Sequence, residues 1–181
     1  VGIGYYTRGM HIEIIPNPSK DDVWYIRKHL QEFNLKFLEV TEEKPFVFFA
    51  KDDESGARIG GISCRTFGQW LDIELLWVRE DRRGEGIGSL LLDRAIDRGR
   101  QSGCTHAWLN TFSFQSPEFY IQRGFTKVFE QANYPKSSSR AFLVREIENG
   151  GDAGKSVSQD EVVGAPGSIT IGDPPEASEE S

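Results

Sequence analysis

One stretch constrains the fold of this chain more than any other, the glycine-rich run Arg83-Gly84-Glu85-Gly86-Ile87-Gly88-Ser89. The apolar segment 71–78, which has the pattern of a strand, precedes it. An amphipathic helical pattern follows, with one apolar stripe formed by Ile87, Leu91, Leu92, Ala95 and Ile96. A strand that passes through a tight glycine turn into a helix is typical of a sheet covered by helices. The turn also lets a ligand approach the backbone closely, and the free N–H groups of the helix start attract an anion.

Two common phosphate-binding motifs do not fit this turn. A Walker A loop requires Gly-Lys-Ser/Thr, whereas Gly88 is followed directly by Ser89, which excludes a P-loop nucleotide triphosphatase. A dinucleotide-binding turn requires Gly-x-Gly-x-x-Gly, and the spacing of Gly84, Gly86 and Gly88 is wrong for it. The pattern that remains is Arg-x-x-Gly-x-Gly, formed by Arg83, Gly86 and Gly88. By itself this pattern also fits a turn with a purely structural role.

The rest of the sequence predicts an alternation of strands and helices. Apolar segments bounded by turn residues predict strands over 10–15, 45–50, 58–66, 71–78, 107–110, 126–130 and 140–147. Helices are predicted after a capping box at 19–22 with a break near Asn34, from Ile87 to a Ser102-Gly103 stop, and from Pro117 to Gly124. This order predicts an α/β (α+β) three-layer domain with a central mixed, mostly antiparallel sheet flanked by helices.

The charge of the chain is concentrated at one end. The 181 residues carry a formal net charge of −7, and the segment 148–181 alone holds eight acidic residues and one lysine, so residues 1–147 are balanced. The segment has no aromatic residue and is rich in Gly, Ser, Pro and Asp, which predicts a disordered acidic tail. The sole methionine, Met10, opens the first predicted strand, so residues 1–9 are interpreted as an upstream extension or an added remnant. The domain is therefore expected at 10–147.

Composition excludes several classes of protein. Hydrophobic residues make up 38% of the chain, enough for a buried core, but no run approaches the ~18 apolar residues of a membrane span. Two cysteines and three scattered histidines give neither a disulfide scaffold nor a zinc signature, so no metal is expected. The negative charge disfavours nucleic-acid binding. We expect a cytoplasmic protein that binds neither nucleic acid nor membrane.

A second motif lies downstream of the glycine-rich turn, Phe119-Tyr120-Ile121-Gln122-Arg123-Gly124-Phe125, which contains Tyr-x-x-x-Gly-Phe. Together with Leu76-Trp77-Val78 and the turn, it resembles the GNAT-type N-acetyltransferases over roughly residues 10–147. The resemblance implies acetyl-CoA as co-substrate and transfer of its acetyl group to a primary amine of a small-molecule or peptidic acceptor. It also implies direct attack by the amine, without a covalent enzyme intermediate.

The resemblance assigns the cofactor to three stretches of the chain. The backbone of Trp77 and Val78 is expected to bind the pantetheine arm, and a backbone N–H within 76–78 to polarise the thioester carbonyl. The pyrophosphate is expected on Arg83, Gly84, Gly86, Ile87, Gly88 and Ser89. Where the common family pattern has Asn and Ala, this chain has Ser113 and Ser116. The candidates for the missing polar contacts are Asn110, Thr111 and Gln115.

Two side chains are candidates for the proton transfers. Tyr120 matches the tyrosine that protonates the departing CoA thiolate in many family members, and a phenol with a pKa near ~10 keeps its proton at neutral pH. Glu74 is the candidate base for the acceptor ammonium. Strand alternation places Asp72 on the same face, and mutual repulsion is expected to raise the pKa of one of the two carboxyl groups. The alternatives are a packed core aromatic for Tyr120 and a solvent-facing position for the carboxylates, which is the expectation for Asp72.

The acceptor and the assembly are left open by the sequence. Glu39, Glu42 and Glu43 form either an acidic rim that recruits a cationic acceptor or a solvated loop. A homodimer is compatible with the resemblance. The alternative function is a non-catalytic module of the same fold that binds or senses acyl-CoA and presents the acidic tail to a partner.

Overall fold

The computed structural model of the chain describes residues 5–7 and 9–148. The described residues divide into two compact units, one up to Thr41 and one from Glu42 to Glu148. The acidic tail predicted from residue 148 onward lies outside the described residues, apart from Glu148 itself. Within the described residues, no helix is long and apolar enough to cross a membrane.

The first unit begins with a short hairpin. Strand β1 (Tyr5–Thr7) pairs antiparallel with β2 (Met10–Ile12) in a two-stranded sheet of their own. The strand predicted over 10–15 is therefore shorter than expected, and residues 5–7 of the segment interpreted as an extension take part in the hairpin. An alternating apolar pattern indicates extended backbone but does not select the partner strand, which depends on register.

Helix α1 (Lys20–Asn34) begins and ends where the sequence predicts. The backbone N–H of Asp22 donates to the Ser19 hydroxyl (3.1 Å), and the backbone N–H of Ser19 donates to the Asp22 carboxylate (2.8 Å). This is the predicted capping box, which satisfies donors that a helix start otherwise leaves free.

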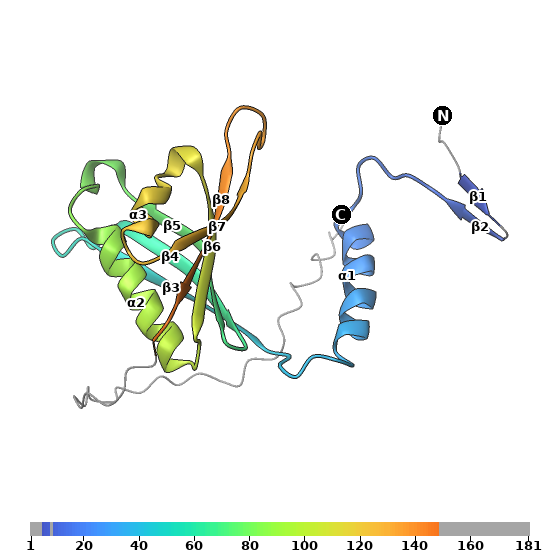
Figure 1. The fold of residues 1–181 in the computed structure, drawn as a ribbon, viewed down its shortest axis with the longest axis horizontal. Coiled ribbons are helices and arrows are strands. Elements are labelled where there is room, and N and C mark those ends of the chain that lie inside the picture. Colours follow the sequence, from blue (N-terminus) through green and yellow to red (C-terminus); the bar gives the residue numbers. More distant parts are fainter. Residues whose placement is uncertain (1–4, 8, 149–181) are drawn as a thin grey trace, which may run out of the picture. The chain divides into compact units, whose positions relative to one another are not determined.

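The second unit is built on a six-stranded sheet with the strand order β3-β4-β5-β6-β8-β7 (Figure 1). Its strands are β3 (Glu43–Lys51), β4 (Arg58–Phe67), β5 (Trp70–Val78), β6 (His106–Phe112), β7 (Thr126–Gln131) and β8 (Arg140–Glu146). Neighbouring strands are antiparallel except β5 and β6, which are parallel and are connected through a helix. The predicted mixed, mostly antiparallel sheet is confirmed.

Helix α2 (Ile87–Gln101) lies across β3, β4 and β5 (Figure 1) and places the predicted apolar stripe in the core. Its buried side chains include Leu91, Leu92, Ala95 and Ile96. Gly99 allows the helix to approach the sheet, because a Cβ atom there would lie 3.0 Å from the Leu71 side chain. The short helix α3 (Pro117–Ile121) contributes Tyr120 to the same core. Two 3-10 turns that the sequence did not predict, η1 (Glu80–Arg82) and η2 (Ser113–Gln115), complete the unit.

Strands β5 and β6 diverge soon after they begin. Their parallel pairing joins Trp70–Asp72 to His106–Trp108 and goes no further within the described residues. Residues 73–78 of β5 therefore present a backbone edge that β6 does not cover. An uncovered strand edge keeps N–H and C=O groups available for a ligand.

A β-bulge in β5 lies next to this point of divergence. Ser63 of β4 is opposite Leu75, whereas the next β4 residue, Cys64, is opposite Ile73, so Glu74 is the extra residue. A bulge bends its strand and redirects the side chains beyond it. Glu74 is thus placed where the two strands separate.

Candidate active site

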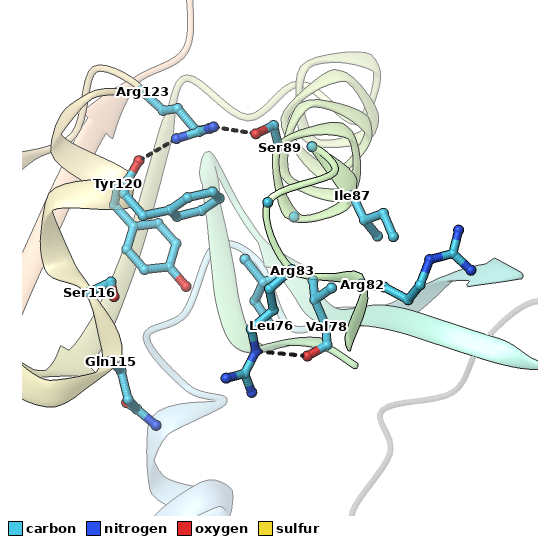
Figure 2. A pocket seen from close by; sticks show the side chains of 14 residues that line it. Leu76, Val78, Arg82, Arg83, Ile87, Ser89, Gln115, Ser116, Tyr120 and Arg123 are labelled. Atoms are coloured by element: carbon cyan, nitrogen blue, oxygen red, sulfur yellow. Dashed lines mark hydrogen bonds between the residues drawn. The ribbon is translucent and has the colours of Figure 1, made fainter. Parts of the chain in front are cut away.

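Two adjoining cavities open where β5 and β6 diverge. The turn cavity, of about 520 Å³, is lined by β5, the glycine-rich turn, the start of α2, and α3 (Figure 2). The strand cavity, of about 690 Å³, is lined mainly by β5, β6 and η2. The residues that belong to both walls are Leu76, Val78, Arg83, Gln115, Ser116 and Tyr120.

The turn cavity ends at the start of α2. Gly84 and Gly86 have φ angles of +86° and +83°, a backbone conformation that glycine adopts without strain. Gly86 is the N-cap of α2, and no side chain caps the helix and no acidic residue stands in its first turn. The first helical hydrogen bond runs from the Leu90 N–H to the Gly86 carbonyl (3.0 Å), so the N–H groups before Leu90 remain available. The helix dipole and these donors together favour an anion.

Two arginines of the turn differ in how their charge is compensated. Arg82 is paired with Asp52 (2.8 Å) and with Glu85 (2.8 Å). Arg83 instead donates from Nε to the Val78 carbonyl (3.3 Å), as Figure 2 shows, and has no carboxylate partner in the described part of the chain. Arg83 therefore carries the uncompensated positive charge of the turn.

A third arginine reaches the helix start from α3. Arg123 donates to the Ser89 hydroxyl (Figure 2). It also donates to the Phe119 carbonyl (2.8 Å), and its guanidinium lies 3.9 Å from the centre of the Phe119 ring. No carboxylate among residues 9–148 pairs with it. The stacked ring and the two hydrogen bonds fix this cation beside the α2 N-terminus.

Tyr120 lies on the wall that the two cavities share. Its ring packs edge-on against Phe119 (4.9 Å between ring centres) and against Phe125 (6.0 Å), and its residue is 9% exposed. Figure 2 shows its hydroxyl pointing into the cavity. Burial raises the pKa of Tyr120 to about 12, so the phenol keeps its proton at neutral pH and is available as a donor.

The carboxylates of β5 gather around one arginine of β4. Asp72 accepts from Arg65 at 2.9 Å, and Glu74 lies 3.6 Å from the Arg65 Nε. Glu74 also accepts from the Ser63 hydroxyl (3.2 Å). Both carboxylates therefore lie on one face of the sheet, as strand alternation predicts, but Glu74 lines the strand cavity and Asp72 does not.

The expected solvent-facing position of Asp72 is wrong. Its side chain is 15% exposed, against 41% for Glu74, because Arg65 covers it. Burial raises the pKa of Asp72 above its usual value, the Arg65 guanidinium lowers it in part, and the negative charge of Glu74 adds to the rise. The pKa of one carboxyl group is therefore raised, at Asp72, but mainly by burial and not by the mutual repulsion that was predicted as the cause.

The polar groups of β6 and η2 divide between the cavities and the core. The Gln115 amide oxygen accepts from the Phe112 N–H (3.1 Å), and its side chain lines both cavities. Ser113, at the position where the common pattern has Asn, accepts from the Ser139 N–H (3.3 Å) and lines neither cavity. Asn110 lines the strand cavity but not the turn cavity.

This arrangement agrees with the comparison of the sequence with known families. Residues 11–125 match the family model described as Acetyltransferase (GNAT) family. The chain belongs to the GNAT acetyltransferases. The match spans the glycine-rich turn and ends at Phe125, the last residue of the second motif.

Relatives and solved structures support the same assignment. The chain is 34% identical over 116 residues to blasticidin-S acetyltransferase of Streptomyces morookaense. The aligned region covers 62% of this chain and 85% of that protein. It resembles the crystal structure of an acetyltransferase from Bacillus cereus ATCC 14579 with a TM-score of 0.68 and 29% identity, over 74% of this chain and 96% of the other. The fold also matches an aminoglycoside 6'-N-acetyltransferase complexed with coenzyme A, with a TM-score of 0.52 and 16% identity over 60% of this chain and 76% of the other.

The GNAT assignment fixes the donor substrate and the type of reaction. Acetyl-CoA is the acetyl donor, and the chain is an N-acetyltransferase. Within the described residues, no group of three or more His, Cys, Asp or Glu side chains is placed to hold a metal ion.

The structure brings the predicted site residues of this GNAT domain to the walls of the two cavities. Those of the turn cavity are Val78, Arg83, Gly84, Gly86, Ile87, Gly88, Ser89, Gln115 and Tyr120. Those that line the strand cavity are Glu74, Trp77, Val78, Arg83, Asn110, Gln115 and Tyr120. Thr111, the third candidate for a polar contact, is 4% exposed and also lines the strand cavity.

Sequence reasoning missed several wall residues. Arg123 is one of them, although a cation directly before Gly124 in the second motif was a usable signal. Phe112 and Phe114 are others, because nothing in a run of alternating Phe and polar residues shows which ring faces a cavity.

Proposed function

We propose that acetyl-CoA lies in the turn cavity with its pyrophosphate at the α2 N-terminus, and that the acceptor amine enters through the strand cavity. One observation carries this proposal: the two cavities share a wall that contains Tyr120, one ends at an uncapped helix start and the other contains a carboxylate. The thioester then lies at the shared wall, where donor and acceptor meet. Holding both reactants in one such geometry is itself a large part of catalysis.

The pyrophosphate is bound by backbone and by two arginines in this proposal. The N–H groups of Ile87, Gly88 and Ser89 donate to the phosphate oxygens. Arg83 and Arg123 supply the charge, since Arg82 is already neutralised by its carboxylates. When Arg83 turns to the phosphate, it releases the Val78 carbonyl, which then accepts from an amide of the pantetheine arm.

The acyl transfer itself uses the uncovered edge of β5. A backbone N–H within 76–78 donates to the thioester oxygen and stabilises the negative charge of the tetrahedral intermediate. The amine attacks the carbonyl carbon, the C–N bond forms and the C–S bond breaks. Before the attack, Glu74 accepts one proton from the acceptor ammonium, directly or through water, which frees the nitrogen lone pair. As the C–S bond breaks, Tyr120 donates its proton to the departing thiolate, and the second proton that the nitrogen loses returns the Tyr120 phenolate to the phenol through solvent.

The acceptor in this proposal is a primary amine that arrives as a cation. The support is the carboxylate of Glu74 in the strand cavity and the two further carboxylates, Asp72 and Glu43, that surround Arg65 beside it. The blasticidin-S acetyltransferase similarity supports a small molecule over a peptide.

Localisation and assembly are further parts of the proposal. The free cysteines, Cys64 and Cys104, are both buried and fit a reducing cytoplasm. A homodimer is proposed because β3 and β7 are the outer strands of the sheet and offer backbone edges for self-association. Light scattering of the purified chain measures this directly.

The test of the proposed function has two readouts. Acetyl-CoA at ~100 times its Kd should stabilise the chain by about 2.7 kcal/mol, which raises Tm by a few degrees. Free thiol should then appear when cationic primary amines are added. Saturable binding of acetyl-CoA without thiol release for any amine would contradict the catalytic proposal and favour the acyl-CoA-binding module.

A further inference from the structure

The acceptor side of the site contains a stack of three aromatic rings, Phe114, Phe112 and Tyr134, here called the aromatic platform. Its role in acceptor binding rests on the proposed function. Phe114, which lines the strand cavity, is 68% exposed. Its ring lies nearly parallel to that of Phe112, with 5.0 Å between ring centres and 12° between planes. Phe112 is stacked in turn on Tyr134 (5.8 Å, 14°), and the Arg140 guanidinium lies 4.2 Å from the Tyr134 ring centre. Phe114 is the last ring of this stack on the side of the cavity.

Backbone contacts between segments that are distant in sequence connect the two parts of the platform. Phe112 of β6 is opposite Arg140 of β8 in the sheet register. The Ser113 N–H donates to the Ser139 carbonyl (2.9 Å), which ties η2 to the β7–β8 connection that carries Tyr134. These contacts hold the backbone that carries Phe112 next to the connection that carries Tyr134. Exposed aromatic rings that adjoin one another in a cavity wall are a feature of binding surfaces.

The same cavity contains one carboxylate, on the β5 side, in addition to Arg83 on the wall that it shares with the turn cavity. Glu74 lines it with its partly exposed carboxylate, and Trp77 lines it with a second large ring that is 50% exposed. A ligand that satisfies both features needs a flat π-surface for Phe114 and a cation for Glu74. Aliphatic polyamines satisfy the second feature alone.

We propose that the acceptor is a small molecule in which a planar aromatic or heteroaromatic ring is joined to the primary amine that becomes acetylated. The ring stacks on Phe114 and the ammonium group lies toward Glu74. Offset stacking is a geometry that aromatic rings prefer, and its binding energy depends on the flatness of the ring as well as on the apolar area that is buried. Phe114 is then a specificity-determining residue of the acceptor site.

Matched amine pairs separate planarity from hydrophobicity. The first pair is 2-phenylethylamine and 2-cyclohexylethylamine, and the second is 4-phenylbutylamine and 4-cyclohexylbutylamine. The members of each pair share the ammonium group and the linker and differ in the flatness of the ring. We expect the CoA-saturated full chain to bind the aromatic member of at least one pair about threefold to tenfold more tightly, by calorimetry. The same preference should appear in kcat/KM for thiol release from acetyl-CoA.

A matched set of variants assigns the preference to the platform. Phe114→Leu keeps apolar volume and removes the flat surface, so the preference should fall below about twofold. Phe129→Leu is the control, because Phe129 is a 59% exposed residue of β7 that lines neither cavity. The control should keep the preference and the activity of the unmodified chain.

The results of these binding and activity measurements distinguish a failure of the aromatic-acceptor inference from a failure of the proposed catalysis. Equal affinity within both amine pairs overturns the inference even when every amine is acetylated. A Phe114→Leu variant that loses several degrees of Tm and keeps the preference also overturns it, because Phe114 then packs against protein. Aromatic preference in binding without thiol release from any amine supports the platform and contradicts the proposed catalysis.

Discussion

The two ends of the site are built in different ways. At the turn end, consecutive residues from Arg83 to Ser89 supply backbone donors whose geometry depends on glycines and on the start of one helix. At the acceptor end, the groups come from β4, β5, β6 and the β7–β8 connection, and their positions depend on how these strands are paired. In the proposed function, the donor, which is common to the family, is bound by local backbone, and the acceptor is bound by side chains on several strands.

The two ends also differ in charge. Arg83 and Arg123 lie at the turn end without a carboxylate partner within residues 9–148. At the acceptor end, Arg65 contacts three carboxylates, those of Glu43, Asp72 and Glu74. A positive end suits the phosphates of the donor, and a negative end suits an ammonium group.

The largest effect is expected at the wall that joins the two ends. Tyr120→Phe should lower kcat about 100-fold at neutral pH and leave the Kd of acetyl-CoA within about twofold, because the ring keeps its packing and only the proton donor is lost. Because the pKa of Tyr120 is about 12, the rate of the unmodified chain should show no loss from phenol deprotonation below about pH 10. Steady-state kinetics over pH 6–10, combined with calorimetry, measures both. An unchanged kcat would remove Tyr120 from the proposed mechanism.

The second-largest effect is expected on acetyl-CoA binding at the turn end of the site. Arg123→Ala should raise the Kd of acetyl-CoA about tenfold, because one charge-assisted hydrogen bond to phosphate is lost. The KM of the amine should stay within about twofold, and the salt dependence of acetyl-CoA binding should weaken. Calorimetry at two salt concentrations measures this, with Arg94→Ala, an exposed arginine of α2, as control. Equal losses in both variants would show that general charge, rather than position, binds the donor.

A third prediction concerns the pH dependence of stability at the acceptor end. Burial raises the pKa of folded Asp72 above the usual 3.8, so the native state holds that proton more tightly than the unfolded chain does. Its contribution to stability is greatest below pH 3.8 and is lost as pH rises through the raised pKa. Asp72→Asn removes this titration, so its free energy of unfolding relative to the unmodified chain should increase with pH over that range. Urea unfolding at a series of pH values tests the slope, and the Kd of acetyl-CoA should stay within about twofold.

The smallest effect is expected from the arginine of the turn whose charge is compensated. Arg82→Ala should change the Kd of acetyl-CoA less than about twofold, because the guanidinium of Arg82 is already paired with the carboxylates of Asp52 and Glu85. Calorimetry beside Arg123→Ala gives the comparison. A loss as large as that of Arg123→Ala would mean that Arg82 leaves its partners when the donor binds.

The features that were predictable from the sequence are those that depend on neighbouring residues. The capping box at Ser19, the glycine turn before Ile87 and the apolar stripe of α2 involve groups within a few positions of one another. Strand segments were also predictable, because alternating apolar residues indicate a half-buried surface. The consecutive residues of the glycine-rich turn belong to this group, whereas Arg123, which lies at the same end of the site, was not predicted.

The remaining features depend on which strands meet. The pairing of β2 with β1, the burial of Asp72 under Arg65 and the stack of Phe114 on Phe112 and Tyr134 join residues whose distance in sequence carries no signal. Arg123 was visible in a motif, but its place beside Ser89 depends on how α3 packs on the core. By itself, the sequence determined the glycine-rich turn and the start of α2, because both are set by local backbone geometry. The tertiary structure decided the acceptor end, because side-chain exposure, pKa and ring stacking are set by strand register and burial.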